Sequence, residues 1–464
     1  MKRKVVATLL SACMAASLMA GCGQSSGSTA ASDGASAQTS TAGTSESASG
    51  DPLDADGDGA VDNPEDVVVD ENKLVLWSLF AGGDGEYFDS LIEDYNSKNQ
   101  PKQVQSILAA TMADDYYTKL QTAVVAKSGP DIGISHASKL PEFVDQGVVE
   151  PLNDYLDELG VDITTMYPQA NLDAVTFDGQ IYAIPLDTHA EILWYNTDIL
   201  EKAGVPINED GTLNISSWDD FKAILDQCKA VMGEGQSVIS LPSASDDPYR
   251  VWWATYFQMG GTPLVSDDGT QVTMDKDIAV QAADFVRSLY EDGYAAEGIT
   301  DHQKFFQGGN AAFMFGGTWC VGAFTSTEGL NVGCMSWPQL FGQPASWADS
   351  HTLILPVSAD RTEEETLAAV QFMVGASTDE GLIWAQSGQI PAAKSVNESE
   401  GFLSMPLRQN YVSTLEDAVM PTKNPHFFAM KAGMIESLDA LWAGTTDAAG
   451  AIDSLYAVLE SNLS

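Results

Sequence analysis

The sequence has few basic residues, with 21 Lys and Arg against 66 Asp and Glu and a net charge of −45 at pH 7. Three of the basic residues, Lys2, Arg3 and Lys4, lie at the amino terminus, and no acidic residue precedes Cys22. The chain from Cys22 onward therefore carries a charge of −48. Nucleic acid and anionic lipid are poor partners for such a chain. The sequence also has no Lys/Arg cluster that would favour a strongly anionic ligand.

Cysteine is equally scarce, and common catalytic or metal-binding motifs are missing. Beyond the amino-terminal segment the cysteines are Cys22, Cys228, Cys320 and Cys334. CxxC, HExxH and P-loop patterns are absent. These few cysteines imply no disulfide framework. We expect Cys228, Cys320 and Cys334 to be buried free thiols, although Cys320 and Cys334 could pair.

Only one long apolar run is present, from Val5 to Ala20, and it follows Lys2, Arg3 and Lys4. Its length and flanks predict a signal peptide over residues 1–21. The run ends in LMAGC, which resembles a bacterial lipobox and implies a diacylglycerol anchor on Cys22. An ordinary signal peptide is the alternative. Residues 22–53 are mostly Ser, Thr, Ala and Gly, which predicts a disordered tether. We therefore expect the protein on the extracytoplasmic face of a bacterial cell membrane, held there by lipid alone.

Residues 54–66 contain a pattern typical of an EF-hand calcium loop, D-x-D-x-D-G-x₅-E. Calcium is a hard cation that accepts six to eight oxygen ligands. The predicted ligands are Asp54, Asp56, Asp58, the carbonyl of Ala60, Asp62 and Glu65. Pro64 and the absence of a leading helix argue against a paired helix–loop–helix, and an acidic spacer is the alternative. Because the loop precedes the first strand of the folded part, we expect it to lie outside any ligand-binding cleft of that part.

The remaining residues alternate strand-like and helical patterns, which predicts an α/β fold with mostly parallel sheets flanked by helices. Lys73–Trp77 is an unbroken apolar strand, followed by a glycine-rich turn over 80–85 and a helix over 86–96. This order puts Trp77 and Asp84 at the carboxyl end of a strand, where open α/β sheets bind ligands. The folded part is too long for one core and predicts two lobes.

The segment Phe177–Leu200 has the pattern of a chain that passes from one lobe to another. A short strand ends at Pro185, which cannot donate to a sheet. Polar Asp187, Thr188 and His189 follow, and then a second apolar run leads into a helix capped by Asn196 or Thr197. The polar residues would lie at the crossing between the lobes.

Several blocks, in order, resemble the maltose-binding-protein-like solute-binding proteins of sugar ABC transporters. The resemblance rests on YAIPLDTH at 182–189 with YN-x-D-x-L at 195–200, GPDIGISHASKLPEF at 129–143 and FFQGGNAAFMFGGTW at 305–319. It also rests on WADSH at 347–351, GQIPA at 388–392 and MPTKNPHFFAM at 420–430. Asp349 stands where this family often has Asn.

The resemblance implies a two-lobed periplasmic-binding-protein-like fold with a hinge between the lobes. Lobe 1 would comprise 73–184 with 356–415, and lobe 2 would comprise 185–355 with 416–464. It further implies a receptor, not an enzyme, that delivers a carbohydrate to the permease of an ABC importer by hinge closure. The expected ligand-binding residues are Trp77, Phe80, Asp84, Tyr116, His136, Asp187, His189, Trp252, Gly317, Trp319, Ser350, His351 and Gln389.

Three other functions stay open at this point. The many carboxylates suggest a secreted glycoside hydrolase, which would need a carboxyl pair about 5–9 Å apart. The calcium loop suggests a dockerin-like component, although such modules carry two loops and this chain has one. A binding protein that feeds a sensor kinase would have the same sequence features as a transport receptor.

Overall fold

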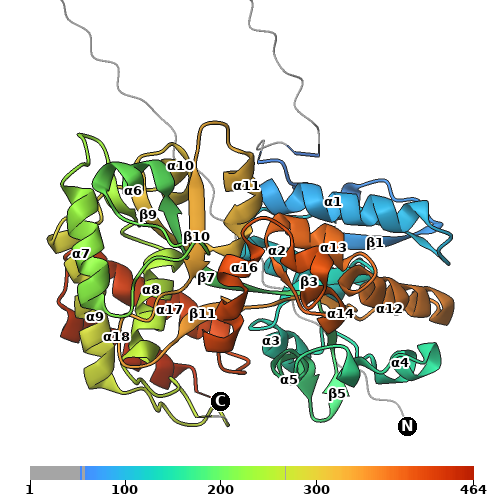
Figure 1. Ribbon diagram of the computed structural model, residues 1–464. Helices are drawn as coiled ribbons and strands as arrows, with labels where there is room; N and C mark the ends of the chain where they lie inside the picture. Colours follow the sequence, from blue (N-terminus) through green and yellow to red (C-terminus); the bar gives the residue numbers. More distant parts are fainter. Residues whose placement is uncertain (1–52, 55–57, 267, 464) are drawn as a thin grey trace, which may run out of the picture. The chain divides into compact units, whose positions relative to one another are not determined.

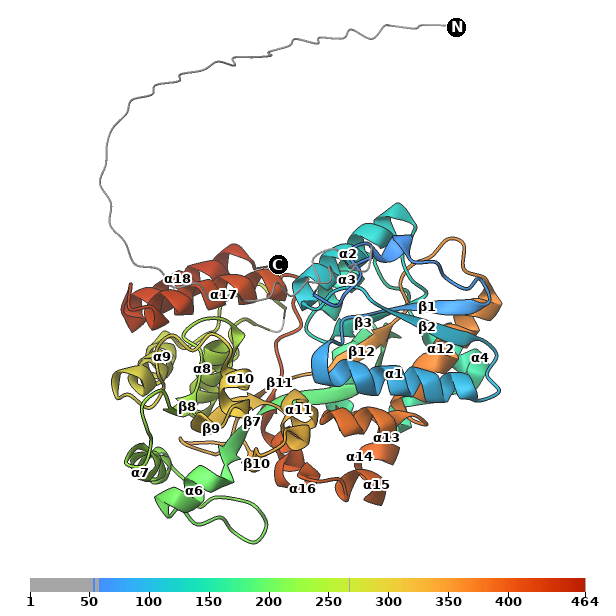
Figure 2. The same ribbon diagram turned by 90° about the horizontal axis from the view of Figure 1, so that it is seen from above.

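The computed structural model describes residues 53–54, 58–266 and 268–463 (Figure 1). The predicted signal peptide, Cys22, nearly all of the tether and Asp56 lie outside the described residues. Within the described part, two separate β-sheets each carry their own helices, and Figure 2 shows both groups from a second direction. These two groups are called lobe 1 and lobe 2 below.

Lobe 1 is built on a five-stranded sheet in the order β2-β1-β3-β12-β6. The apolar run that predicts β1 is buried at Leu74, Leu76 and Trp77, which explains its central place between β2 and β3. The strands are β1 (Lys73–Ser78), β2 (Gln103–Leu108), β3 (Ile132–His136), β6 (Ala183–Pro185) and β12 (His351–Ile354), with a small hairpin of β4 (Thr176–Phe177) and β5 (Gln180–Ile181). The helices are α1 (Gly82–Ser97), α2 (Ala113–Ala126), α3 (Leu140–Asp145), α4 (Asn153–Leu159), α5 (Gln169–Val175), α12 (Glu363–Ser377) and α13 (Gly381–Trp384).

Lobe 2 is built on a sheet in the order β14-β11-β7-β9-β8, in which β10 and β13 also pair with β7. β7 is buried along its whole length and contains the predicted apolar run. It also includes the polar residues 187–189, which were expected to form a break before the strand. The strands are β7 (Asp187–Asn196), β8 (Ser237–Ser240), β9 (Ala311–Gly317), β10 (Val332–Ser336), β11 (Ser346–Asp349), β13 (Ile390–Pro391) and β14 (Ala418–Val419). The helices are α6 (Thr197–Ala203), α7 (Trp218–Lys229), α8 (Asp246–Gln258), α9 (Lys276–Glu291), α10 (His302–Gln307), α11 (Val321–Ser326), α15 (Glu400–Leu403), α16 (Arg408–Tyr411), α17 (Phe427–Trp442) and α18 (Ala448–Ser461). The short helix α14 (Lys394–Asn397) packs instead on the lobe 1 core through Val396.

Local signals set several helix boundaries. The side chain of Asn196 accepts hydrogen bonds from the N–H groups of Asp198 and Ile199, so Asn196 caps α6 as one of the two predicted candidates. Thr362 and Glu365 form a reciprocal capping box at the start of α12. These caps satisfy N–H groups that have no partner within the helix.

The prediction of mostly parallel sheets holds for part of each lobe, since β8 is parallel to β9 and β11 to β14 in lobe 2. β1 is parallel to β2 and β3, but β12 is antiparallel to both β3 and β6. In lobe 2, β7 is antiparallel to β9, β10, β11 and β13. The pairs β6–β12 and β7–β11 are antiparallel because β6–β7 and β11–β12 are nearly continuous strands that pass between the sheets in opposite chain directions.

The chain crosses between lobes at positions that differ from the predicted boundaries. The first crossing is at Leu186, between β6 and β7, one residue from the prediction. The second is at Ser350 rather than after residue 355, because β12 belongs to the sheet of lobe 1. The third crossing segment runs from α13 to α15 rather than lying at residue 415. Ile390 of β13 packs with Trp194 in a lobe 2 cluster, Val396 still packs in the lobe 1 core, and Phe402 of α15 returns to the lobe 2 cluster.

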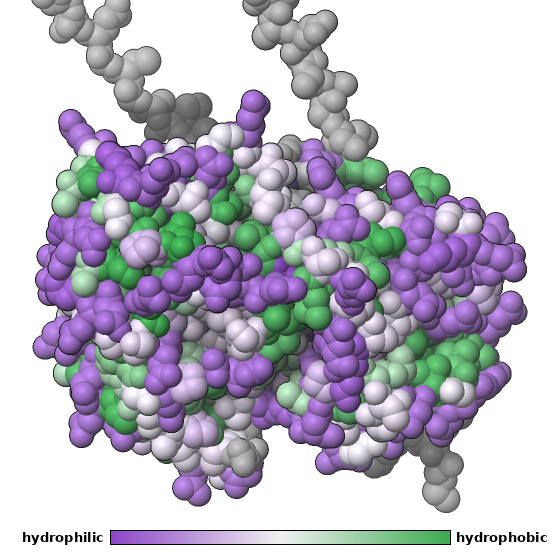
Figure 3. All heavy atoms as spheres, in the orientation of Figure 1, coloured by the Kyte–Doolittle hydropathy of each residue, from purple (hydrophilic) through white to green (hydrophobic). Residues whose placement is uncertain are grey.

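Cys228, Cys320 and Cys334 are buried free thiols, as expected. Hydrophilic side chains cover most of the face seen in Figure 3, in keeping with the excess of acidic residues. Within the part of the chain that the structure describes, no helix combines the length and apolar character needed to cross a membrane.

Candidate functional site

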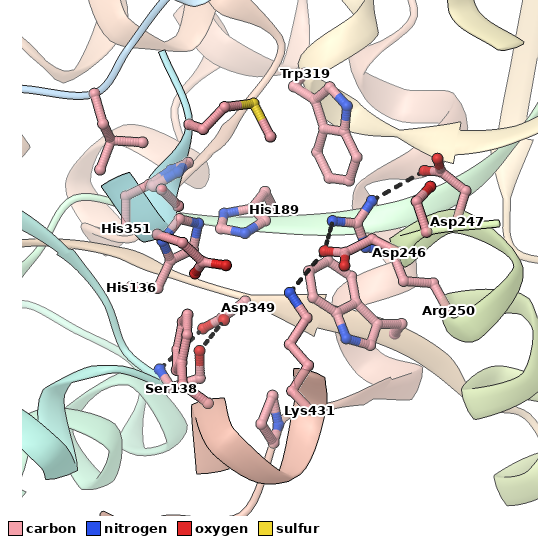
Figure 4. Close-up of a pocket in the computed structure, with 18 of the residues that line it drawn as sticks. His136, Ser138, His189, Asp246, Asp247, Arg250, Trp319, Asp349, His351 and Lys431 are labelled. Carbon is pink, nitrogen blue, oxygen red and sulfur yellow. Dashed lines mark hydrogen bonds and ion pairs between the residues drawn. The ribbon is translucent and has the colours of Figure 1, made fainter. Parts of the chain in front are cut away.

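A pocket of about 570 Å³ lies where the two sheets approach each other (Figure 4). Lobe 1 contributes Asp84, His136 and Ser138, and lobe 2 contributes Arg250 and Trp319. The volume is within the range of small-molecule sites. Side chains of both lobes therefore face one shared cleft.

Strand pairing explains why residues far apart in the sequence meet here. β12 pairs with β3 so that His351 lies opposite His136, and β11 pairs with β7 so that Asp349 lies opposite His189. Of the predicted ligand-binding residues, the structure places Asp84, His136, His189, Trp319, His351 and Gln389 on the pocket wall.

Three predicted aromatic residues lie in the cores and do not line the pocket. Tyr116 is fully buried, and its hydroxyl donates to the carbonyl of Trp77 (3.0 Å) and accepts from the N–H of Ile134 (2.8 Å). Trp77 itself is buried in the lobe 1 core. Trp252 is 0% exposed, and its indole N–H donates to the carbonyl of Ala279 (3.1 Å). The prediction of direct ligand contact is corrected for these three residues, because their polar atoms are used inside the cores.

Four more predicted residues lie behind the wall and hold it in place. Phe80 packs edge-to-face against His351 at a ring separation of 4.8 Å. The hydroxyl of Ser350 donates to the carbonyl of Asp187, and the carbonyl of Gly317 accepts from the indole of Trp194 (3.2 Å). The prediction of direct ligand contact is therefore corrected for four residues. They support the residues of the pocket wall from behind: Phe80, Asp187, Gly317 and Ser350.

The carboxylate of Asp187 is buried between two histidine rings. It lies 2.9 Å from Nδ1 of His351 and 3.3 Å from Nδ1 of His189, and it accepts the indole N–H of Trp384 (2.8 Å). Burial alone would raise its pKa, but the positive charge of His351 and the histidine hydrogen bonds hold the pKa of Asp187 below its usual range. Conversely, Asp187 raises the pKa of His351 against the opposing effect of burial.

Gln389 connects the two lobes across the floor of the pocket. Its amide N–H donates to Asp84 of α1 (3.0 Å), and its carbonyl oxygen accepts from the hydroxyl of Thr318 (2.9 Å). Burial raises the pKa of Asp84 to about 7. The second oxygen of this carboxyl, Oδ1, is buried and has no hydrogen-bond partner within the described part of the chain. A ligand hydroxyl would satisfy it.

On the lobe 2 side, the guanidinium of Arg250 packs against two indole rings. Its central carbon lies 5.0 Å from the ring centre of Trp319 and 4.5 Å from that of Trp347. The same guanidinium pairs with Asp246 and Asp247 at 3.1 Å and with Glu191 at 3.4 Å. Burial raises the pKa of Glu191 to about 8. Lys431 of α17 completes the group by pairing with Asp246 (2.6 Å).

Asp349, where the resemblance implies Asn, has the partners that a carboxylate requires. It accepts hydrogen bonds from the N–H (3.3 Å) and the hydroxyl of Ser138 and from the N–H of Ser350 (2.8 Å). All three partners donate hydrogen bonds to Asp349, and the two carboxylate oxygens of Asp349 accept them. An aspartate can therefore occupy this position. Ser138 belongs to lobe 1 and Asp349 ends β11 of lobe 2, so this contact also joins the lobes.

Sequence reasoning missed Arg250, Trp347 and Lys431 on the pocket wall. The charged residues of α8 are spaced as (i, i+3) and (i, i+4) pairs, Asp246 and Asp247 with Arg250, which usually indicates a solvated helix face. Trp347 lies within the WADSH block, and its place in that block could have identified it as a residue of the pocket wall.

The predicted calcium loop has one backbone feature expected of such a loop, at Gly59. Gly59 has a φ of +92°, the left-handed turn expected at its position, and its N–H donates to Asp54 (3.1 Å). Asp58 accepts the N–H of Ala60 (2.8 Å) and the hydroxyl of Thr111 (3.0 Å). Glu65 accepts the hydroxyl of Ser128. None of the described loop residues lines the pocket, as expected, but Asp58 contacts Thr111, which does line it.

The comparisons with known proteins agree on one family. A model described as bacterial extracellular solute-binding protein matches residues 90–410. The arabinooligosaccharide-binding protein of Halalkalibacterium halodurans is 24% identical over 269 residues, 56% of this chain and 56% of that protein. The matched part of the chain spans about half the length of the first curated relatives.

Solved structures share the fold. The GacH receptor of Streptomyces glaucescens, determined unliganded and in complex with acarbose, has a TM-score of 0.73 at 18% identity, covering 84% of this chain and 98% of that chain. UgpB of Mycobacterium tuberculosis, in complex with glycerophosphocholine, has a TM-score of 0.74 at 20% identity with the same coverage. At these identities the likeness establishes a two-lobed α/β fold.

Proposed function

The chain belongs to the bacterial extracellular solute-binding protein family, and on this premise we propose that it is a receptor that captures a carbohydrate and delivers it to an ABC importer. The observation that carries this proposal is the interlobe pocket, which combines the indoles of Trp319 and Trp347 with polar side chains of both lobes. Sugars present both weakly positive C–H faces and hydroxyl groups. Aromatic rings favour the former, and carboxyl, amide and guanidinium groups favour the latter.

Capture would proceed by closure of the two lobes about the three crossing segments. A ligand that contacts both lobes binds the closed state better and shifts the population toward it. The contacts Asp84–Gln389 and Ser138–Asp349 already join the lobes. The permease would then recognise the closed arrangement. We expect an affinity of about 1 μM or tighter, near −8 kcal/mol.

The carboxylates of the pocket favour binding over hydrolysis. Glycoside hydrolysis needs one free carboxylic acid and one free carboxylate on either side of the scissile bond. Here Asp246 and Asp247 pair with Arg250, Asp349 accepts three hydrogen bonds, and Asp114 is exposed to solvent on α2. Only Asp84 combines a raised pKa with an unpartnered oxygen among the described acids of the pocket. The arrangement suits recognition of hydroxyl groups, so we propose that the protein is not an enzyme.

We further propose that Cys22 carries a lipid anchor and that the folded part lies on the extracytoplasmic face of the cell membrane. The support is the LMAGC sequence and the composition of residues 22–53. The family to which the chain belongs is extracellular, in agreement with this location.

Calcium binding by the loop over residues 54–65 is also proposed. The support is the spacing of its oxygen ligands and the left-handed conformation of Gly59. Calcium would fix the loop that touches Thr111, and a loss of calcium would loosen this side of the pocket.

A thermal-shift screen of the purified full-length protein tests the carbohydrate proposal. The panel should contain monosaccharides, linear oligosaccharides of several linkages and, as a ligand of another class, glycerophosphocholine. A ligand at 100 times its Kd adds about 2.7 kcal/mol to the free energy of unfolding, which raises the melting temperature measurably. A shift with a sugar supports the proposal. A shift with glycerophosphocholine and none of the sugars would replace the proposed ligand class.

A further inference from the structure

Three histidines from both lobes meet on one wall of the pocket (Figure 4). His136 ends β3 and His351 begins β12 in the sheet of lobe 1, and His189 lies in β7 of lobe 2. One ring nitrogen of each lies within 4.8 Å of those of the other two. The ring centres of His189 and His351 are 4.3 Å apart, and that of His136 is 4.7 Å from His351 and 5.3 Å from His189.

An oxygen-bearing side chain behind each ring fixes its orientation. Asp187 contacts Nδ1 of His189 and of His351, and the hydroxyl of Tyr117 contacts Nδ1 of His136. In the described part of the chain, each of these three rings makes its side-chain hydrogen bonds through Nδ1. The remaining nitrogen, Nε2, is therefore the atom that each ring offers to a ligand. Metal-binding histidines show this arrangement, in which a carboxylate or other oxygen holds the ring nitrogen that faces away from the ion.

We propose that His136, His189 and His351 form a three-imidazole site for Zn²⁺, bound through the three Nε2 atoms. Imidazole nitrogens favour zinc over calcium or magnesium, which take oxygen ligands. Three histidines leave the fourth tetrahedral position open. That position faces the pocket, where water or a hydroxyl of a bound ligand completes the coordination. The site is built from different atoms than the sugar contacts at Trp319 and Arg250, and the proposal stands independently of the proposed function.

Binding of the ion would also hold the lobes together. Nitrogens that share a tetrahedral zinc at about 2.05 Å lie about 3.3 Å from one another. The candidate nitrogens of this site lie within 4.8 Å of one another and come from both lobes, so a bound ion would tie His189 of lobe 2 to His136 and His351 of lobe 1 at this short spacing. Zinc would therefore favour the closed arrangement with or without a sugar.

Calorimetric titration of the full-length protein with ZnCl₂ tests the site. The protein must carry no polyhistidine tag and must first be stripped with a chelator. Excess calcium in the buffer fills the acidic loop and other carboxylate sites. We expect one Zn²⁺ per chain with a Kd of about 1 μM or tighter. His189→Gln should weaken binding by about 100-fold or more, and Tyr117→Phe, which removes only the partner of His136, by about 10- to 100-fold.

His426→Gln is the matched control, since His426 is exposed and lies outside the three-histidine cluster. Its zinc affinity should equal that of the wild type. The absorption spectrum of the Co²⁺-loaded wild type gives a second readout that requires no variant, because tetrahedral and octahedral Co²⁺ differ strongly in visible absorption. A tetrahedral spectrum that zinc displaces supports the site.

Two results would overturn the proposal. One is the absence of stoichiometric zinc binding with an octahedral Co²⁺ spectrum, and the other is equal zinc affinity in the wild type and in folded His189→Gln. Sugar titrations in the presence of chelator keep the two proposals apart. Sugar binding without zinc binding refutes only the metal site, and zinc binding without any sugar ligand refutes only the carbohydrate receptor.

Discussion

Alanine substitutions of two tryptophans distinguish a residue of the pocket wall from a residue of the hydrophobic core. The sequence made both Trp252 and Trp319 candidates for sugar contact, with Trp319 supported by the Gly-Gly turn before it. In the structure Trp252 is 0% exposed within the lobe 2 core, whereas Trp319 is partly exposed and lines the pocket. Trp319→Ala should therefore damage binding, and Trp252→Ala should damage stability.

The magnitudes follow from these surroundings. Trp252→Ala leaves a buried cavity and an unpaired carbonyl at Ala279, and it should lower the free energy of unfolding by about 3–5 kcal/mol. Trp319→Ala removes the stacking of Arg250, worth about 0.5–1 kcal/mol, and a half-buried ring, so the loss of stability should stay near 1–2 kcal/mol. Sugar affinity should fall by about 1–3 kcal/mol, roughly 5- to 150-fold.

Urea unfolding without ligand and calorimetric titration with the best sugar of the screen measure both quantities for each variant. Trp319→Phe is a conservative control that retains an aromatic face and should recover part of the affinity. Folded Trp319→Ala that binds sugar as well as the wild type would refute the stacking role. A loss of stability in Trp319→Ala as large as that in Trp252→Ala would place the ring in the core instead.

Three further predictions concern other parts of the chain. Cys22→Ala should move the protein from the membrane fraction to the soluble fraction, and a variant that remains with the membrane after a high-salt wash would contradict the lipid anchor. Asp58→Ala should abolish the calorimetric signal of calcium, while Asp66→Asn, just outside the loop, should retain it; equal signals in both variants would remove the calcium assignment. Gly388→Ala should lower the free energy of unfolding by about 2 kcal/mol or more, because φ is +113° and a Cβ would overlap the carbonyl of Thr318; an unchanged urea midpoint would contradict the strained turn that positions Gln389.

The sequence predicted the positions of secondary-structure elements best where a residue type strongly favours one local structure. Continuous apolar runs located β1 and β7, Asn196 identified a helix start, and the polar residues after Pro185 marked the first crossing to within one residue. Those signals are local, and local backbone and capping chemistry decides them. The assignment of His136, His189 and His351 to the cleft rested on the resemblance of their sequence blocks to the family, not on strand patterns.

Features that depend on contacts between distant segments could not be predicted in this way. A sequence does not reveal that the ion pairs of α8 point inward to Trp319 and Trp347. Nor does it distinguish Trp252 from Trp253 or Trp319, since all are single large apolar side chains in apolar surroundings. The antiparallel pairs of β12 and β7 depend on the direction in which the chain returns, which composition and periodicity do not encode.

The central claim is that the interlobe pocket binds a carbohydrate without changing it. The most direct measurement is a calorimetric titration of the wild type with the best sugar of the screen, followed by chromatography of the recovered sugar. We predict one sugar per chain, a Kd of about 1 μM or tighter and an unaltered sugar. Hydrolysed sugar in the recovered sample, or no saturable heat with any sugar that shifts the melting temperature, would contradict the account.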